Sequence, residues 1–275
     1  MADTGTDTDM AAGEGAGTGA GTEHAGKTFT IAAAYQGYPG IALGGYVAGL
    51  LVGRTDAGAV RVDFRAATRV ETPLRFDELA DGVVRLSDTA GTELVTATPV
   101  RAPSTTDAPA PPTPAEARTA AEAFRAAGLA GLDAGGASID CFGCGHRPPD
   151  QGVHQQCMGV PGRGLVATAW TPHPAFADAR GSLRPEALWA ALDCPTAWAG
   201  IHLGTLRRGA VTASLTATSP RPVTAGEEHI TYAWPISTVG RKHTMGVAVA
   251  TSAGELCTVG EALWIDPRER SRPES

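Results

Sequence analysis

Asp193 is the residue whose chemical type fits its sequence surroundings least. It lies inside Pro185–Gly200 (PEALWAALDCPTAWAG), an apolar, Ala-rich stretch that predicts a helix. A carboxylate among apolar neighbours costs free energy unless it has a partner, so Asp193 is a candidate general base or nucleophile. The alternative interpretation is that Asp193 accepts a structural hydrogen bond from a loop.

Cysteines and histidines gather in the second half of the sequence. They are Cys141, Cys144 and Cys157, in the pattern Cys-x2-Cys-x12-Cys, with His146 and His154 nearby. Such a set can hold tetrahedral zinc, but the chain has no second Cys-x-x-Cys pair, and a packed turn with free thiols is the favoured interpretation. We therefore predict no metal. Cys194 has no histidine at a useful spacing, which disfavours a cysteine nucleophile.

The composition excludes several classes of protein. The 275 residues include 29 acidic and 22 basic ones, a net charge of −7, with no stripe of Lys or Arg that would neutralise nucleic-acid phosphates. No apolar run approaches the roughly 18 residues of a membrane span, and the N-terminus lacks the pattern of a signal peptide. Five cysteines, an odd number, do not indicate a disulfide framework. We expect a soluble, cytoplasmic protein with no nucleic-acid or membrane partner.

Shifts in composition divide the chain into five segments. Residues 1–26 are rich in glycine and acidic residues and predict a disordered tail. A Pro-rich and Ala-rich stretch at 101–138 predicts a linker that carries one helix. The linker separates an N-terminal half at 27–100 from a C-terminal half at 139–268, and a charged tail follows at 269–275.

The two halves look like copies of one unit. Each has a helical stretch, Leu43–Arg54 and Pro185–Gly200, followed by a strand that opens with Gly-Ala-Val. These strands begin at Gly58 and Gly209, 151 residues apart, and alternating patterns predict further strands after each. One helix followed by antiparallel strands, repeated, predicts an α+β fold of two antiparallel sheets, each wrapped round its own central helix.

Three stretches carry a resemblance to a known family. The segment YQGYPGIALGGYVAGLL from Tyr35 resembles the "QGYPGIVHGG…LLD" stretch of hot-dog-fold acyl-CoA thioesterases of the phenylacetyl-CoA type. CFGCGHRPPDQGV from Cys141 and ALWAALDCPTAWA from Ala187 are similar to two further stretches of that superfamily, the second being its central helix. Most of 27–266 is covered, and the resemblance implies a double hot-dog in which two fused copies replace the usual dimer.

The sequence departs from the family pattern at the catalytic positions. Leu43 stands where the family has a histidine before its glycine pair, and Val52 stands where it has an acid. In the second half, Pro185 and Glu186 replace the glycine pair, whereas Asp193 keeps the acid position. Each half therefore has what the other lacks.

Sites in hot-dog dimers combine the helix N-terminus of one subunit with the acid of the other. By that analogy one composite site remains here, with Gly44 and Gly45 facing Asp193, while the mirror site at Val52 and Pro185 is inactive. The resemblance implies that Asp193 acts as base or nucleophile. Unpaired amides at a helix N-terminus, here those of Gly45 and Tyr46, would stabilise the oxyanion.

Eight residues are expected to contact the substrate. They are Tyr35, Gln36, Tyr38, Leu43, Gly44, Trp189, Arg241 and Lys242. The basic pair lies where the family places the pantetheine and phosphates, and a solvated hairpin is its alternative. The aromatic and amide side chains before the first helix fit a tight turn equally well, and Trp189 is more typical of a core residue.

The function that the resemblance implies is hydrolysis of an acyl thioester, linked to coenzyme A or to an acyl carrier protein. No cofactor is expected beyond the coenzyme A or carrier-protein pantetheine of the substrate. Two alternatives stay open: cyclisation or dehydration of a polyketide-like or other small molecule, and non-catalytic binding of an acyl group or small molecule. Further candidate partners are an acyl carrier protein and a second copy of the double hot-dog.

Overall fold

The computed structural model describes residues 28–103, 108–127, 140–207 and 209–268. Its centre is one antiparallel sheet of ten strands in the order β2-β3-β4-β1-β7-β10-β9-β8-β6-β5. The strands are β1 (Ala59–Phe64), β2 (Leu74–Glu78), β3 (Val84–Asp88), β4 (Glu93–Pro99), β5 (Met158–Val160), β6 (Leu165–Trp170), β7 (Val211–Thr218), β8 (His229–Val239), β9 (Lys242–Thr251) and β10 (Leu256–Ile265).

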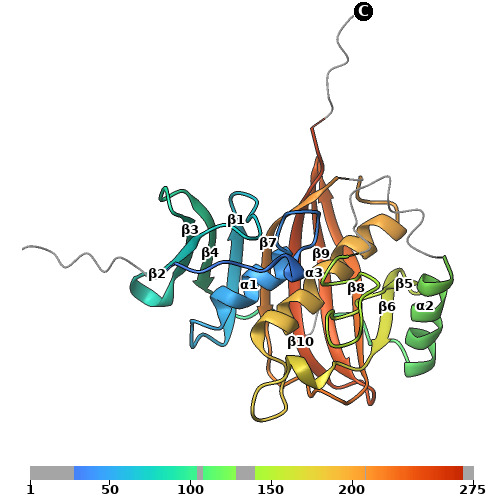
Figure 1. Cartoon of the computed structure of the whole chain (residues 1–275). Helices are drawn as coiled ribbons and strands as arrows, with labels where there is room; N and C mark the ends of the chain where they lie inside the picture. The colour runs from blue at the N-terminus through green and yellow to red at the C-terminus, as the bar shows by residue number, and fades with distance from the viewer. Residues whose placement is uncertain (1–27, 104–107, 128–139, 208, 269–275) are drawn as a thin grey trace, which may run out of the picture.

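Three α-helices complete the described fold: α1 (Gly44–Val52), α2 (Pro114–Ala127) and α3 (Pro185–His202). Figure 1 shows α1 and α3 side by side against the sheet, with α2 beside the β5 and β6 edge. The α+β class is thereby confirmed. No helix in these four ranges is both long enough and apolar enough to cross a membrane.

The prediction of two separate sheets is wrong, because the two halves share one. Strand β1 pairs with β7 in antiparallel register, with Val60 opposite Ala217 and Val62 opposite Leu215. Each half would otherwise expose the unpaired backbone groups of an edge strand at this point, and pairing satisfies them. The order outward from this junction is the same on both sides: β4, β3 and β2 in one direction, β10, β9 and β8 in the other.

The two halves differ at their outer ends. Beyond β8 the C-terminal half adds β6 and β5, whereas beyond β2 the N-terminal half has one isolated bridge between Phe29 and Leu74. The N-terminal copy is therefore the smaller one. Its helix is also shorter, nine residues in α1 against 18 in α3.

Two glycines let α1 and α3 approach closely. A Cβ atom at Gly45 would overlap the carbonyl of Trp189, and one at Gly49 would overlap the backbone of Pro185 and Glu186. Helices pack at such short range where side chains are absent at the contact. This contact brings the N-terminus of α1 to the middle of α3.

Helix α3 continues through Pro195, which lies between Trp189 and Trp198, although a proline commonly kinks or ends a helix. Proline removes one hydrogen bond inside a helix, but α3 is buried along most of its length, and tertiary packing outweighs that local cost. Both tryptophans lie in the core, with 4% and 2% of their surface exposed.

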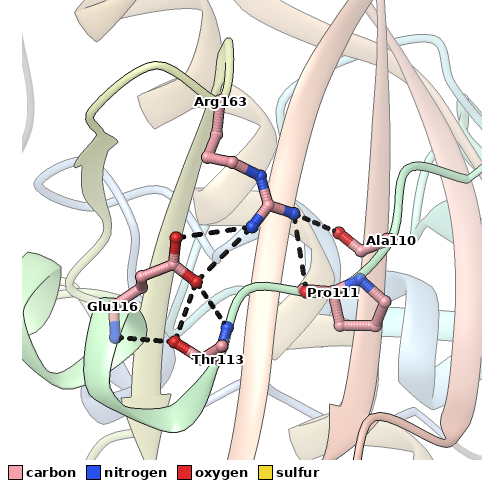
Figure 2. Close-up of polar contacts among 5 residues, drawn as sticks. All are labelled: Ala110, Pro111, Thr113, Glu116 and Arg163. Carbon is pink, nitrogen blue, oxygen red and sulfur yellow. Dashed lines mark hydrogen bonds and ion pairs between the residues drawn. The ribbon is translucent and has the colours of Figure 1, made fainter.

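The linker is attached to the C-terminal half through a capping box on α2 (Figure 2). Glu116 accepts a hydrogen bond from the amide of Thr113 (2.7 Å), and the Thr113 hydroxyl accepts one from the amide of Glu116 (3.3 Å). Arg163, between β5 and β6, lies 3.4 Å from the Glu116 carboxylate and donates to the carbonyl of Ala110 (2.6 Å). Ala117 and Ala120 then pack on the sheet face opposite α3.

Candidate functional site

A cavity of about 360 Å³ lies where the two halves meet. Its wall comes from the turn and first residues of α1, the end of β1, the middle of α3 and the start of β7. Most of the lining is apolar, and Asp193 is the one carboxylate among the described residues that line it. The cavity therefore joins the two elements that the sequence paired in a composite site.

Asp193 lies on the cavity wall with only 3% of its surface exposed. Its Oδ2 accepts a hydrogen bond from the amide of Gly45 (2.8 Å), and its Oδ1 accepts one from the hydroxyl of Thr212 (3.0 Å). Burial raises the pKa of Asp193 to about 6, while these two hydrogen bonds act to lower it. The group can therefore exchange a proton near neutral pH.

The N-terminus of α1 has the amides that a developing oxyanion needs. Val47 makes the first hydrogen bond of the helix, to the carbonyl of Leu43, so the amides before it have no partner within the helix. The Gly45 amide faces Asp193, and a Cβ at Gly44 would stand 3.0 Å from Oδ2 of the same carboxylate. In the structure, the hydrogen bond of the Gly45 amide goes to the Asp193 carboxylate.

A second contact holds the backbone of Asp193. The hydroxyl of Thr196 donates to the Asp193 carbonyl (2.6 Å), and the indole of Trp264 donates to that hydroxyl (2.8 Å). Trp264 lies on β10 and itself lines the cavity. The acid is thus supported from α3, β7 and β10 together.

Three of the predicted substrate contacts line the cavity: Tyr38, Leu43 and Gly44. The Tyr38 hydroxyl reaches the carbonyl of Ala210 (3.5 Å). Burial, followed by the charge of Asp193, raises the pKa of Tyr38 to about 12, so this hydroxyl stays protonated. It can donate a hydrogen bond to a bound carbonyl.

Five predicted residues are not part of the cavity lining: Tyr35, Gln36, Gly45, Tyr46 and Trp189, although the Gly45 amide bonds to Asp193, which lines the cavity. Tyr35 stacks on Tyr46 with ring centroids 4.1 Å apart, and Phe142 meets both rings edge-on. The Gln36 side chain accepts from the amide of Gly40 (3.1 Å), so it shapes the turn. These side chains fill the space between the turn and the core, which spacing alone does not reveal.

The predicted phosphate contacts, Arg241 and Lys242, also lie outside the lining. Arg241 donates to the carbonyl of Asp266 (2.7 Å), and Lys242 is exposed. Arg207, whose amide donates to the Asp266 carboxylate (2.9 Å), lines the cavity, as does Arg65. Neither arginine was predicted, because Arg65 directly follows strand β1 and Arg207 lies in the loop before β7, and no motif marks either position.

The structure groups the cysteines differently from their spacing. Cys141, Cys144 and Cys194 have their sulfurs within 4.8 Å of one another, and Cys157 is not in this group. All three also line the cavity. Thr212, which donates to Asp193, and Cys194 both line the cavity, although no sequence motif predicted either of them as a substrate contact.

No protein-family model matches the chain, and no curated sequence matches it either. Solved structures do. A provisionally assigned thioesterase from Novosphingobium aromaticivorans matches 88% of this chain and 95% of its own, with a TM-score of 0.56 at 13% identity.

Two other solved structures match at a TM-score of 0.53. The tesB protein of Mycobacterium avium subs paratuberculosis covers 83% of this chain and 89% of its own at 16% identity. A provisionally assigned oleoyl thioesterase from Lactobacillus plantarum covers 88% and 96% at 11% identity. At such identities the likeness shows the fold, and it confirms the hot-dog fold that the sequence resemblance implied.

Proposed function

We propose that the chain hydrolyses acyl thioesters at the composite site, with Asp193 as its general base. One observation carries this proposal: the N-terminus of α1 and the acid of α3 meet on one cavity, with the Gly45 amide 2.8 Å from the Asp193 carboxylate. An amide donor and a carboxylate side by side are what hydrolysis of a carbonyl compound requires.

The proposed reaction uses the proton exchange of Asp193. When a thioester enters, the Asp193 carboxylate breaks its hydrogen bond with the Gly45 amide and accepts one from a water molecule instead. It then removes a proton from this water as the water oxygen attacks the carbonyl carbon. The Gly45 amide, now released by Asp193, receives the negative charge on the carbonyl oxygen. The tetrahedral intermediate then collapses, the carbon–sulfur bond breaks, and Asp193 returns the proton to the leaving thiolate. The products are a carboxylic acid and a thiol.

Two arginines on the cavity lining suit a phosphorylated thiol. Arg65 and Arg207 line the cavity with more than half of each side chain exposed, and Arg241 donates to the same Asp266 as Arg207. Guanidinium groups bind phosphate oxygens strongly and with defined geometry. The substrate class is therefore an acyl group on coenzyme A, or on the phosphopantetheine of a carrier protein, with no further cofactor.

The test is thiol release from short, aromatic and long acyl-CoAs by wild type and by Asp193→Asn. Loss of an acid–base group should lower the rate by roughly 100-fold or more. Asp150→Asn, an exposed aspartate outside the cavity lining, is the matched control and should keep the rate. An Asp193→Asn rate equal to wild type would contradict the assigned role. Acyl-CoA binding without turnover by the folded wild type would instead support a binding protein.

A further inference from the structure

Three buried cysteines converge on the cavity wall from two distant parts of the chain. Cys141 and Cys144 belong to the turn before β5, and Cys194 belongs to α3. They are 5%, 4% and 7% exposed, and their sulfur atoms all lie within 4.8 Å of one another. All three residues line the cavity, so the group can be reached from it.

Gly143 makes this convergence possible. A Cβ atom at that position would overlap the sulfur of Cys194. The residue between the two cysteines of the turn therefore has to lack a side chain for the third thiol to reach them. The amide of Gly145 closes the turn by donating to the carbonyl of Cys141 (2.8 Å).

The backbone amides of Gly143 and Cys144 in the turn donate toward the sulfur of Cys141. Amide donors aimed at a sulfur stabilise a thiolate, the form in which cysteine binds metals. The indole nitrogen of Trp198, 2% exposed as a residue, has no hydrogen-bond partner among the described residues, and Trp198 lines the same cavity as the three cysteines.

The sulfur spacing matches a metal centre. The Cys141 and Cys194 sulfurs are 3.8 Å apart. Zinc–sulfur bonds of about 2.3 Å in a tetrahedron place the sulfurs about 3.8 Å from one another. This separation is much longer than a disulfide bond of about 2.05 Å and equals the distance between two thiolates that share a tetrahedral ion.

We propose that Cys141, Cys144 and Cys194 bind one Zn²⁺ ion as three thiolates, with the fourth position open to the cavity. Three thiol protons are released, three zinc–sulfur bonds form, and the centre carries one net negative charge. Asp193 immediately precedes Cys194 in the sequence, but both of its carboxylate oxygens are engaged, by the Gly45 amide and the Thr212 hydroxyl. Hard cations such as Mg²⁺ are unsuited to an all-sulfur site. The proposal does not depend on thioester hydrolysis.

The test is metal titration of the full chain, reduced with tris(2-carboxyethyl)phosphine and stripped with a chelator. Co²⁺ is the spectroscopic probe, because tetrahedral thiolate ligation gives visible d–d bands and a thiolate-to-metal charge-transfer band. Zn²⁺ should then displace one Co²⁺ per chain and abolish these bands. Stoichiometric Zn²⁺ should also slow the alkylation of three of the five cysteines, a readout on the unmodified protein.

Variants separate this site from other buried thiols. Cys141→Ser and Cys194→Ser should bind Zn²⁺ at least about 100-fold more weakly, since even changes to groups that only support ligands cost about 10- to 100-fold. Cys157→Ser and Cys257→Ser, also buried and free, are the matched controls and should bind as wild type does. Circular dichroism checks that each variant is folded.

Two outcomes would overturn the proposal. One is a reduced wild-type protein that takes up no Co²⁺ or Zn²⁺ and whose alkylation is unaffected by either ion. The other is equal metal binding by Cys194→Ser and Cys257→Ser. Formation of a Cys141–Cys194 disulfide in air, with no metal bound after reduction, would identify a redox pair instead.

Discussion

The amide of Gly45 donates a hydrogen bond to the carboxylate of Asp193 across 2.8 Å, although 148 residues separate them. This bond joins the first residues of one helix to the middle of another, inside a sheet that both halves share. It leaves the carboxylate buried yet in contact with a cavity. Several measurable properties should follow from that relationship.

Replacing Gly45 by alanine should destabilise the protein. The added Cβ would overlap the Trp189 carbonyl and lie 2.8 Å from the Cβ of Asp193, so α1 and α3 would have to separate. Overpacking of this kind costs about 1–3 kcal/mol. Urea unfolding measures the change. Gly58→Ala is the control, because a Cβ there meets nothing within 4 Å, and an equal loss in both variants would contradict the close contact.

Asp193→Asn should stabilise the protein at neutral pH while it removes activity. The folded state raises the Asp193 pKa from 3.8 to about 6. Between these values the folded chain keeps a proton that the unfolded chain loses. The free energy of unfolding therefore falls as pH rises through this range, by up to about 3 kcal/mol.

Because asparagine stays neutral, the excess of the variant's free energy of unfolding over that of wild type should be largest above pH 6 and should vanish near pH 4. Urea unfolding of both proteins at the two pH values measures it, with Asp150→Asn as the exposed control. A variant less stable than wild type at neutral pH would show that the site depends on the charge.

Thr212→Val should shift the pH dependence of hydrolysis upward. If Asp193 acts as the base, the rate rises with pH as the carboxylate forms, with a midpoint near its pKa of about 6. The Thr212 hydroxyl helps to lower that pKa, so removing it raises the midpoint. The pH profile of kcat/KM measures the shift. Thr216→Val, on the same strand but outside the cavity lining, should leave the midpoint unchanged.

Arg207→Gln should weaken the use of acyl-CoA without affecting a truncated substrate. Loss of one charge-assisted contact to phosphate costs about 1.5–3 kcal/mol, so the KM for acyl-CoA should rise roughly tenfold or more. The KM for the same acyl group on unphosphorylated pantetheine should not change. Arg118→Gln, on α2 and paired with Glu228, is the control. An equal change in KM for both substrates would show that Arg207 does not bind the coenzyme A phosphates.

The attachment of α2 should weaken in acid. The Thr113 amide, followed by its hydroxyl, lowers the pKa of the exposed Glu116 carboxylate. A carboxyl group with a lowered folded-state pKa stabilises the fold above its unfolded value of 4.5, and this contribution is lost as pH falls through the folded value. Hydrogen-exchange protection of α2 amides at pH 7 and pH 3 tests it. Glu116→Gln should show the weaker protection already at pH 7, because it also loses the ion pair with Arg163.

The sequence by itself determined the local elements and the key pairing. Apolar stretches with glycine or proline at their starts predicted helices that lie at Gly44–Val52 and Pro185–His202. Alternating residues after Gly58 and Gly209 predicted strands, now β1 and β7. Periodicity of this kind reflects which face of an element is buried, a property of neighbours in the chain. The resemblance to hot-dog thioesterases, with the acid missing from one half and the glycine pair from the other, further implied the pairing of Gly45 with Asp193.

Only the tertiary structure decided which residues of different helices and strands contact one another. The edges of β1 and β7 joined into one sheet, Tyr46 turned toward Tyr35, and Cys194 replaced Cys157 beside the cysteine turn. Each outcome depends on packing between residues far apart in the sequence, where a side chain's direction is set by whatever space its neighbours leave. Pattern specifies faces, and packing specifies contacts.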